Sequence, residues 1–209
     1  MMKRKIVLAT RNEGKVRELN ALLAGSGIEA VGLANFPDIG EVEENGTTFE
    51  ENALLKAREV AKLTGLPCLA DDSGISADAL GGGPGVFSAR YGDDWDKIKG
   101  ETRDQRNTRK LLSETRDAGE RGCRYITVMA AALPDGEAIT TRGEWAGSLL
   151  REPRGTNGFG YDPVFLDPEL NKTAAELSPR EKNERSHRGK ATRAMLEKLP
   201  AFLARAEKT

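Results

Sequence analysis

The chain has 209 residues, 38% of them hydrophobic, which is enough for one sizeable core. With 32 lysines and arginines against 33 acids, its net charge of −1 excludes the global basic field that nucleic-acid and anionic-membrane binders need. No stretch approaches the roughly 20 apolar residues of a membrane span, and the first apolar run is too short for a signal peptide. The two cysteines, Cys68 and Cys123, are far apart in the sequence, which is typical of free thiols in a reducing compartment. We therefore expect a cytoplasmic protein that binds a small ligand.

The amino terminus joins an apolar run to a polar loop. Residues 5–9 are continuously apolar, which predicts a strand covered on both faces. A helix is expected next, with one apolar stripe made of Val16, Leu19, Leu22 and Leu23. Between strand and helix, backbone N–H groups and the helix dipole favour a phosphate, and the residues there are Thr10, Arg11, Asn12, Glu13, Gly14 and Lys15. This is not a Walker loop, because the first glycine is missing, and an ordinary polar connection is the alternative.

A second strand is predicted over residues 28–33, followed by a long acidic connection over residues 37–46 that contains Glu41, Glu43 and Glu44. Most acidic runs are simply solvated. Long connections without regular structure are nevertheless uncommon in compact domains unless they serve a site. One of these acids could therefore join Asp72 around a metal ion.

The next helix begins with overlapping capping boxes, Thr47 with Glu50 and Thr48 with Glu51, and runs to Gly65. Its predicted apolar stripe consists of Phe49, Ala53, Ala57, Val60 and Ala61. Asn52 and Lys56 lie one turn apart, so both could project from one exposed face toward a ligand. The alternative is a plain polar face.

The stretch from Leu69 to Gly74 places Asp71, Asp72 and Ser73 at the end of an apolar run. Strand side chains alternate between faces, so both acids can face one ligand only if the strand has begun to turn there. We expect one acid to face the chemistry and the other to support the turn. Residues 75–80 are expected to pair back as a strand, and the glycine-rich residues 81–85 to form a turn.

The middle of the chain predicts a mostly polar helix over residues 101–119 and then a hairpin. A strong strand over residues 125–133, a Pro134-Asp135-Gly136 turn and a partner strand over residues 137–150 make up the hairpin, with one solvated side. Together the elements indicate an α/β fold, a mixed sheet flanked by helices, in a single domain over residues 1–209.

The last third concentrates unusual residues. Residues 155–163 place Phe159, Tyr161 and Asp162 among glycines, and Phe159 could stack on a base or be buried under the loop. A short helix is expected to begin at Ser178, and the final helix to open near His187 with the stripe Ala191, Ala194, Met195, Leu199, Phe202 and Leu203. His187 is the only histidine, which excludes a multi-histidine metal site.

Six blocks in this order resemble the inosine triphosphate pyrophosphatase family, nearly end to end. The blocks are residues 9–15, 50–57, 70–74, 80–85, 159–163 and 186–188. The resemblance implies an elongated mixed α/β fold of two lobes with the nucleotide in a central cleft, usually as a homodimer. It also implies Mg²⁺-dependent hydrolysis of ITP, dITP and XTP to the monophosphate and pyrophosphate, which keeps these nucleotides out of DNA and RNA.

The resemblance also implies a role for particular residues. Asp72 takes the catalytic position and would hold Mg²⁺ together with Glu44, while the Thr10–Lys15 loop and Lys56 would hold the phosphates. The other substrate-binding residues would be Ser73, Phe159, Gly160, Tyr161, Asp162, Lys182, His187 and Arg188, with Phe159 stacked on the purine. Arg11 stands where many relatives have a small residue, so whether it faces phosphate or solvent is open.

Two other functions compete with this one. The first is a regulatory module that binds a nucleotide without chemistry, which does not need the metal-binding acids. The second is an enzyme with another substrate range, such as a phosphatase that releases phosphate or a pyrophosphatase for modified pyrimidines. A 6-oxo purine presents an acceptor where adenine presents a donor, so donation by Arg188 would disfavour ATP.

Overall fold

The computed structural model describes residues 4–40 and 42–205, so Glu41 of the acidic connection lies outside the described residues. Its seven strands form one mixed sheet in the order β2-β1-β3-β4-β5-β6-β7. β1 runs parallel to β2 and β3, whereas β6 is antiparallel to β5 and β7. The bounds are Arg4–Leu8 (β1), Ile28–Gly32 (β2), Cys68–Ala77 (β3), Gly122–Ala132 (β4), Ala138–Leu149 (β5), Phe165–Asp167 (β6) and Lys172–Thr173 (β7).

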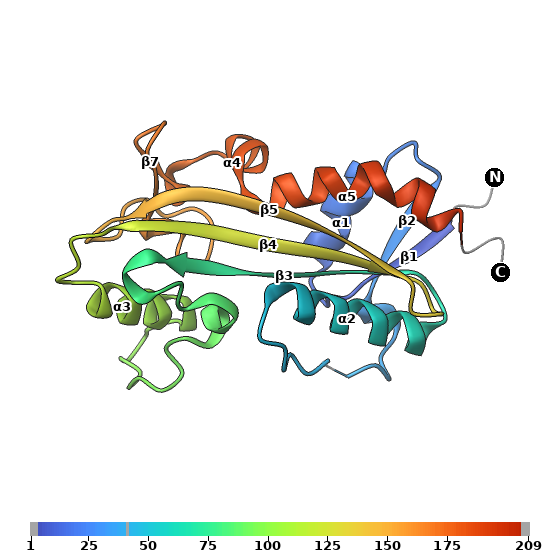
Figure 1. The fold of residues 1–209 in the computed structure, drawn as a ribbon, viewed down its shortest axis with the longest axis horizontal. Coiled ribbons are helices and arrows are strands. Elements are labelled where there is room, and N and C mark those ends of the chain that lie inside the picture. Colours follow the sequence, from blue (N-terminus) through green and yellow to red (C-terminus); the bar gives the residue numbers. More distant parts are fainter. Residues whose placement is uncertain (1–3, 41, 206–209) are drawn as a thin grey trace. The chain divides into compact units, whose positions relative to one another are not determined.

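Five α-helices flank this sheet (Figure 1). They are α1 (Glu13–Leu22), α2 (Phe49–Thr64), α3 (Arg103–Glu114), α4 (Pro179–Arg185) and α5 (His187–Leu203). The sheet and its flanking helices confirm the predicted α/β class. Of the helices in the described part of the chain, none has the length and apolarity needed to cross a bilayer.

The chain packs into two compact units, and each is assembled from separate segments. The first unit contains residues 1–72, 128–142 and 191–209. In its core, α1 and α5 pack against one face of the strands through residues such as Val16, Leu19, Met195 and Leu199, and α2 lies on the opposite face (Figure 1). The stripe predicted for α2 is fully buried, as helix burial against a sheet requires.

The second unit contains residues 73–127 and 143–190. Its core gathers Leu111 of α3, Tyr125 of β4, Trp145 of β5 and Phe165 of β6. The rings of Tyr125 and Phe165 lie 4.5 Å apart, and those of Trp145 and Phe165 lie 4.7 Å apart. Aromatic packing therefore fixes the position of the middle of β4, which carries residues next to the candidate site.

Strand β3 differs from the prediction. It continues without a turn through Asp71, Asp72 and Ser73 to Ala77, and residues 78–80 form a 3₁₀ turn in place of a returning strand. The predicted turn at Ser73 and Gly74 is therefore wrong. Because the strand stays extended, the side chains of Asp71 and Asp72 emerge on opposite faces of the sheet.

Several smaller predictions need correction. The hairpin exists, but β4 is buried on both faces from Tyr125 onward, so only β5 shows the expected alternation. Leu22 of the predicted α1 stripe is 54% exposed, because α1 ends there. The capping box of α2 uses Thr48 with Glu51 alone, and Glu50 instead accepts a hydrogen bond from Thr140.

Candidate functional site

Asp72 lies against α2 in the first unit and is held by two side chains of that helix. The Asn52 amide donates to Asp72 Oδ2 at 3.1 Å, and Lys56 Nζ lies 3.7 Å from Asp72 Oδ1. Asn52 is completely buried and also accepts the N–H of Gly46 at 2.8 Å. Asn52 and Lys56 therefore point inward at the acids of β3, and the predicted exposed polar face is wrong for this pair.

The Lys56 ammonium is the centre of a cluster of oxygen atoms. It donates to Glu44 Oε1 at 2.9 Å and to the carbonyl oxygen of Asp71 at 2.6 Å, in addition to its ion pair with Asp72. Glu44 comes from the acidic connection, so the chain brings both predicted metal-binding carboxylates to one cation. Each of these three side chains keeps only part of its surface in water, which strengthens their mutual attraction.

The carboxylates of Glu44 and Asp72 suit Mg²⁺ chemically, because Mg²⁺ prefers hard oxygen ligands and usually takes one or two protein carboxylates with substrate phosphates. Over the described ranges, no group of three or more histidine, cysteine or acidic side chains is placed to hold a metal by itself. Glu44 and Asp72 therefore supply two oxygen donors of the kind that a magnesium ion takes.

Asp71 serves the opposite face of β3. Its Oδ1 lies 3.5 Å from Nζ of Lys15 at the start of α1. Because successive side chains of a strand point to opposite faces, Asp71 contacts the loop after β1 and Asp72 contacts α2. The two acids thus have different partners, as expected from the pleat of an uninterrupted strand.

The Thr10–Lys15 loop is fixed mainly by its own side chains. Asn12 caps α1 by accepting the N–H groups of Gly14 at 2.9 Å and Lys15 at 3.3 Å. Two N–H groups expected to be free for phosphate are therefore already bonded. Arg11 donates to the carbonyl oxygen of Ile39 at 2.5 Å, so its side chain ties the loop to the beginning of the acidic connection. Glu13 is exposed.

In the second unit, Asp162 is the centre of another polar cluster. Asp162 is 2% exposed, and its Oδ2 accepts the N–H of Phe159 at 2.8 Å and pairs with the Lys182 ammonium. Its Oδ1 accepts the hydroxyl of Tyr125 at 3.3 Å. Burial, followed by the charge of Asp162, raises the pKa of Tyr125 well above its ordinary value, so the hydroxyl stays a neutral donor.

Phe159 presents its ring to solvent with cations over it. The side chain is 62% exposed, Lys182 Nζ lies 4.8 Å from the ring centroid, and Arg188 Cζ lies 5.6 Å from it. The alternative of a ring buried under the loop is therefore wrong. An exposed aromatic face between cations is suited to stacking on a flat, electron-rich ring.

The beginning of α5 adds two more polar groups to this unit. Arg188 Nη2 donates to Ser73 Oγ at 3.3 Å, which joins two residues predicted to contact substrate. The His187 ring stacks on Tyr125 with centroids 4.6 Å apart and planes 10° from parallel. Tyr125 therefore contacts both His187 and Asp162.

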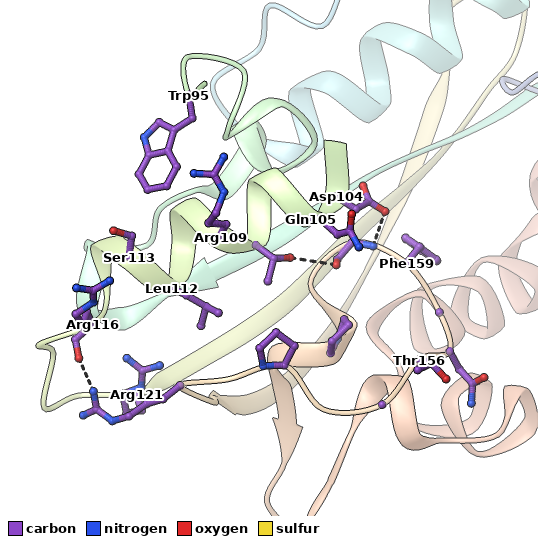
Figure 2. Close-up of a pocket in the computed structure, with 18 residues that line it drawn as sticks. Trp95, Asp104, Gln105, Arg109, Leu112, Ser113, Arg116, Arg121, Thr156 and Phe159 are labelled. Carbon is purple, nitrogen blue, oxygen red and sulfur yellow. Dashed lines mark hydrogen bonds between the residues drawn. The ribbon is translucent and has the colours of Figure 1, made fainter. Parts of the chain in front are cut away.

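Two of the predicted substrate-binding residues, Gly160 and Tyr161, are bonded to other parts of the second unit. Tyr161 is buried and donates its hydroxyl to the carbonyl oxygen of Ser88 at 2.7 Å. The Gly160 N–H is bonded to Asp104 Oδ2 at 2.7 Å, and the Gly160 carbonyl accepts from Thr108 at 3.3 Å, which anchors the loop to α3 (Figure 2). Tyr161 and Gly160 thus shape the loop that presents Phe159.

Asn52 and Tyr125 are not among the site residues predicted from the sequence. For Asn52 the sequence is compatible with a ligand contact or a plain polar face, and only its complete burial next to Asp72 shows that its amide bonds an acid. Tyr125 lies in an apolar strand and reads as core. The available signal was its hydroxyl, because a buried tyrosine usually hydrogen-bonds a polar group.

The Ham1 family model matches residues 6–198. A dITP/XTP pyrophosphatase of Nitratidesulfovibrio vulgaris is 55% identical over 204 residues, which cover 97% of this chain and 99% of that protein. A second, of Symbiobacterium thermophilum, is 51% identical and covers 97% and 98%. The solved structure of a HAM1 protein from Coxiella burnetii has a TM-score of 0.84 at 42% identity, over 97% of this chain and 99% of that chain.

Proposed function

The chain belongs to the Ham1 family, and we propose that it hydrolyses non-standard purine nucleoside triphosphates (dITP, XTP and ITP) to the monophosphate and pyrophosphate. The products follow from attack of water on the α-phosphorus with departure of pyrophosphate. The hydrolysis removes these nucleotides from the pool used for DNA and RNA synthesis. The dITP/XTP pyrophosphatase name of relatives up to 55% identical supports this substrate class.

The observation that carries the proposal is the assembly of Glu44, Asp72 and Lys56 around one another in the first unit. Glu44 and Asp72 would hold Mg²⁺, which when bound neutralises phosphate charge and makes the phosphorus easier to attack. Asp72 orients the attacking water, and Asn52 fixes the orientation of Asp72 by donating to its other oxygen. A nucleotide-binding module without chemistry has no use for this arrangement.

Lys15 and Lys56 supply positive charge at the triphosphate end. Both lysines are only partly exposed, and both contact acids of β3. Phosphoryl transfer depends mostly on positioning and charge neutralisation, so two fixed ammonium groups stabilise the transition state more than mobile surface lysines do.

The cluster around Phe159 is assigned to the purine. Phe159 stacks on the ring system, and Arg188 and Lys182 can only donate hydrogen bonds. An arginine or lysine placed at the 6-position of the purine can donate to the O6 oxygen of a 6-oxo purine. The 6-amino group of adenine is itself a donor, so it cannot form this hydrogen bond. Sites of this kind discriminate by roughly 10⁴-fold. We expect Arg188→Ala to narrow the kcat/KM preference for ITP over ATP, and an equal ratio in variant and parent would contradict the assignment.

The test is product analysis of the purified protein with ITP, XTP, dITP, GTP and ATP, with and without Mg²⁺. We expect the monophosphate and pyrophosphate from ITP, XTP and dITP, in the presence of metal only. Asp72→Asn keeps the shape of the side chain and should lower kcat by at least about a hundredfold, a typical loss for a catalytic group. Release of inorganic phosphate would instead indicate a phosphatase, and binding of ITP without cleavage would indicate a regulatory module.

We also propose that the enzyme works in the cytoplasm as a homodimer. The buried free thiols Cys68 and Cys123 support a reducing compartment. The dimer rests on the family resemblance. Light scattering of the purified protein measures the oligomeric state directly, and a monomer at micromolar concentration would refute this part.

A further inference from the structure

The second unit contains a pocket of about 1010 Å³ between α3 and residues 151–160 (Figure 2). The Phe159 loop forms one side of it and α3 the other. The pocket is lined in part by apolar side chains, including Leu112, Pro153 and Pro163. Its charged lining is strongly unequal, because four arginines and a single acid, Asp104, face it.

Three of the arginines that line the pocket lie in the segments next to three different elements. Arg116 follows α3, Arg121 precedes β4, and Arg151 follows β5. Arg151 donates to the backbone carbonyl of Arg116. Arg121 is fixed by hydrogen bonds to three backbone carbonyls, those of Thr115, Leu149 and Leu150. Main-chain carbonyls therefore hold the guanidinium groups of Arg121 and Arg151, whereas the Arg116 side chain is exposed.

The positive charge of this cluster is not compensated. Within the ranges that the structure describes, none of Arg116, Arg121 and Arg151 has a carboxylate partner. Burial, and then the neighbouring charge of Arg151, lowers the pKa of Arg121. The fourth arginine of the pocket, Arg109, differs because it pairs with Glu101 at 2.8 Å and lies over the Trp95 ring.

We propose that Arg116, Arg121 and Arg151 form a binding site for a phosphate-type anion, distinct from the residues assigned to the substrate triphosphate. A guanidinium presents parallel N–H donors that match phosphate oxygens, and Arg121 and Arg151, which are already held by carbonyls, lose little freedom on binding. Three compounds carry such an anion: pyrophosphate, inorganic phosphate and a nucleoside monophosphate. Lys15 and Lys56 belong to the first unit, so the two sets of cations are separable by mutation.

The experiment is calorimetric titration of the full-length protein in metal-free buffer with pyrophosphate, inorganic phosphate and IMP in turn. We expect Arg116→Gln with Arg151→Gln to remove one class of anion sites or to weaken it by at least about tenfold, the effect of losing strong charge-assisted hydrogen bonds. The order of affinities among the three anions identifies the source. No turnover is needed, so the result is independent of the proposed hydrolysis.

The matched control is Arg58→Gln with Arg205→Gln, which removes the same charge from the first unit, where these arginines contact Gly136 and Glu137. The control should change each affinity by less than about twofold. Equal weakening in both double variants would show a general charge effect and overturn the proposal, as would unchanged binding in Arg116→Gln with Arg151→Gln. Arg116→Gln alone, at an exposed side chain, should give a partial loss in a folded protein.

Discussion

Tyr125 is a buried residue whose hydroxyl and ring serve different neighbours. The hydroxyl bonds Asp162, and the ring stacks on His187. We expect Tyr125→Phe to keep the stacking and lose the hydrogen bond. Because one such bond is worth about 1 kcal/mol, KM for ITP should rise about fivefold with little change in kcat.

The matched control for this change is Tyr91→Phe, which removes another hydroxyl bonded to a carboxylate, that of Glu114. The Tyr91 ring lies under the ammonium of Lys110, which is not one of the residues assigned to the nucleotide. Steady-state kinetics of both variants, with their melting temperatures, decide the point. A rise in KM shared by both variants, or a lower kcat in Tyr125→Phe alone, would argue against a positioning role.

Gly158 is required by its surroundings. Its φ is +79°, and a Cβ built there would lie 2.0 Å from Asp162 Oδ2. We expect Gly158→Ala to displace the Asp162 carboxylate and raise KM for ITP by about tenfold, beyond the strain of about 1–2 kcal/mol that left-handed backbone costs alanine. Gly136→Ala is the control, because φ is +94° with open space around it. Similar kinetics in both variants would refute the steric explanation.

Residue identity predicted polar chemistry well and side-chain direction poorly. Asp72, Glu44 and Lys56 were expected at one site, and the structure brings them within ion-pair distance. The direction of the Asn52 side chain could not be predicted, because a polar residue on a helix is usually solvated. Asn52 is buried only because β3 lies next to α2 and places Asp72 against it. Arg11 was left open for the same reason, since its acceptor is a backbone carbonyl 28 residues away.

At the level of elements, the start of α4 makes stability depend on pH. Hydrogen bonds from Ser178 lower the pKa of Glu181 from an ordinary 4.5 to about 2, with a smaller effect of the charge of Lys172. A pKa lowered by folding contributes stability above the unfolded value of 4.5, and the contribution disappears as pH falls toward 2.

We therefore expect Glu181→Gln to lower the melting temperature at pH 6, and the difference from the parent to shrink between about pH 4.5 and 2. Calorimetric melts at several pH values measure this. The control is Glu184→Gln, a largely exposed residue of the same helix. Its melting temperature should not approach that of the parent as the pH falls. A difference that persists unchanged to pH 2 would contradict the capping explanation.

The elements that were predicted correctly are those with local signals. Ser178 with Glu181 and Thr48 with Glu51 are capping patterns, and the structure has both boxes. Strands β6 and β7 were missed because they have only three and two residues, too few for periodicity. The turn in β3 was wrong because Asp-Ser-Gly favours turns locally, whereas pairing with neighbouring strands decides the conformation.

For the whole molecule, the division into units follows no single cut in the chain. The chain passes from one unit to the other at residues 72/73, 127/128, 142/143 and 190/191. Sequence periodicity carries no information on which distant segments pack together. The prediction of a single domain over residues 1–209 therefore did not divide the chain into these two units. β3, β4, β5 and α5 each contribute residues to both units.

Shared elements should make the two units unfold together. Both tryptophans, Trp95 and Trp145, belong to the second unit, so their fluorescence reports that unit, whereas far-ultraviolet circular dichroism reports all helices. We expect the two probes to give the same urea midpoint. Hydrogen exchange in α1 and α2 supplies the control for the first unit. Separate midpoints would show units of independent stability.

The ion pairs of Lys56 have one more consequence. Two carboxylates brought together without a cation would repel each other and weaken the fold, but here a lysine of the chain itself already balances Glu44 and Asp72. We therefore expect the first unit to fold without an added ion. A preparation kept in EDTA should melt at the same temperature as one kept in Mg²⁺ without nucleotide, and should recover all its activity when the metal is restored.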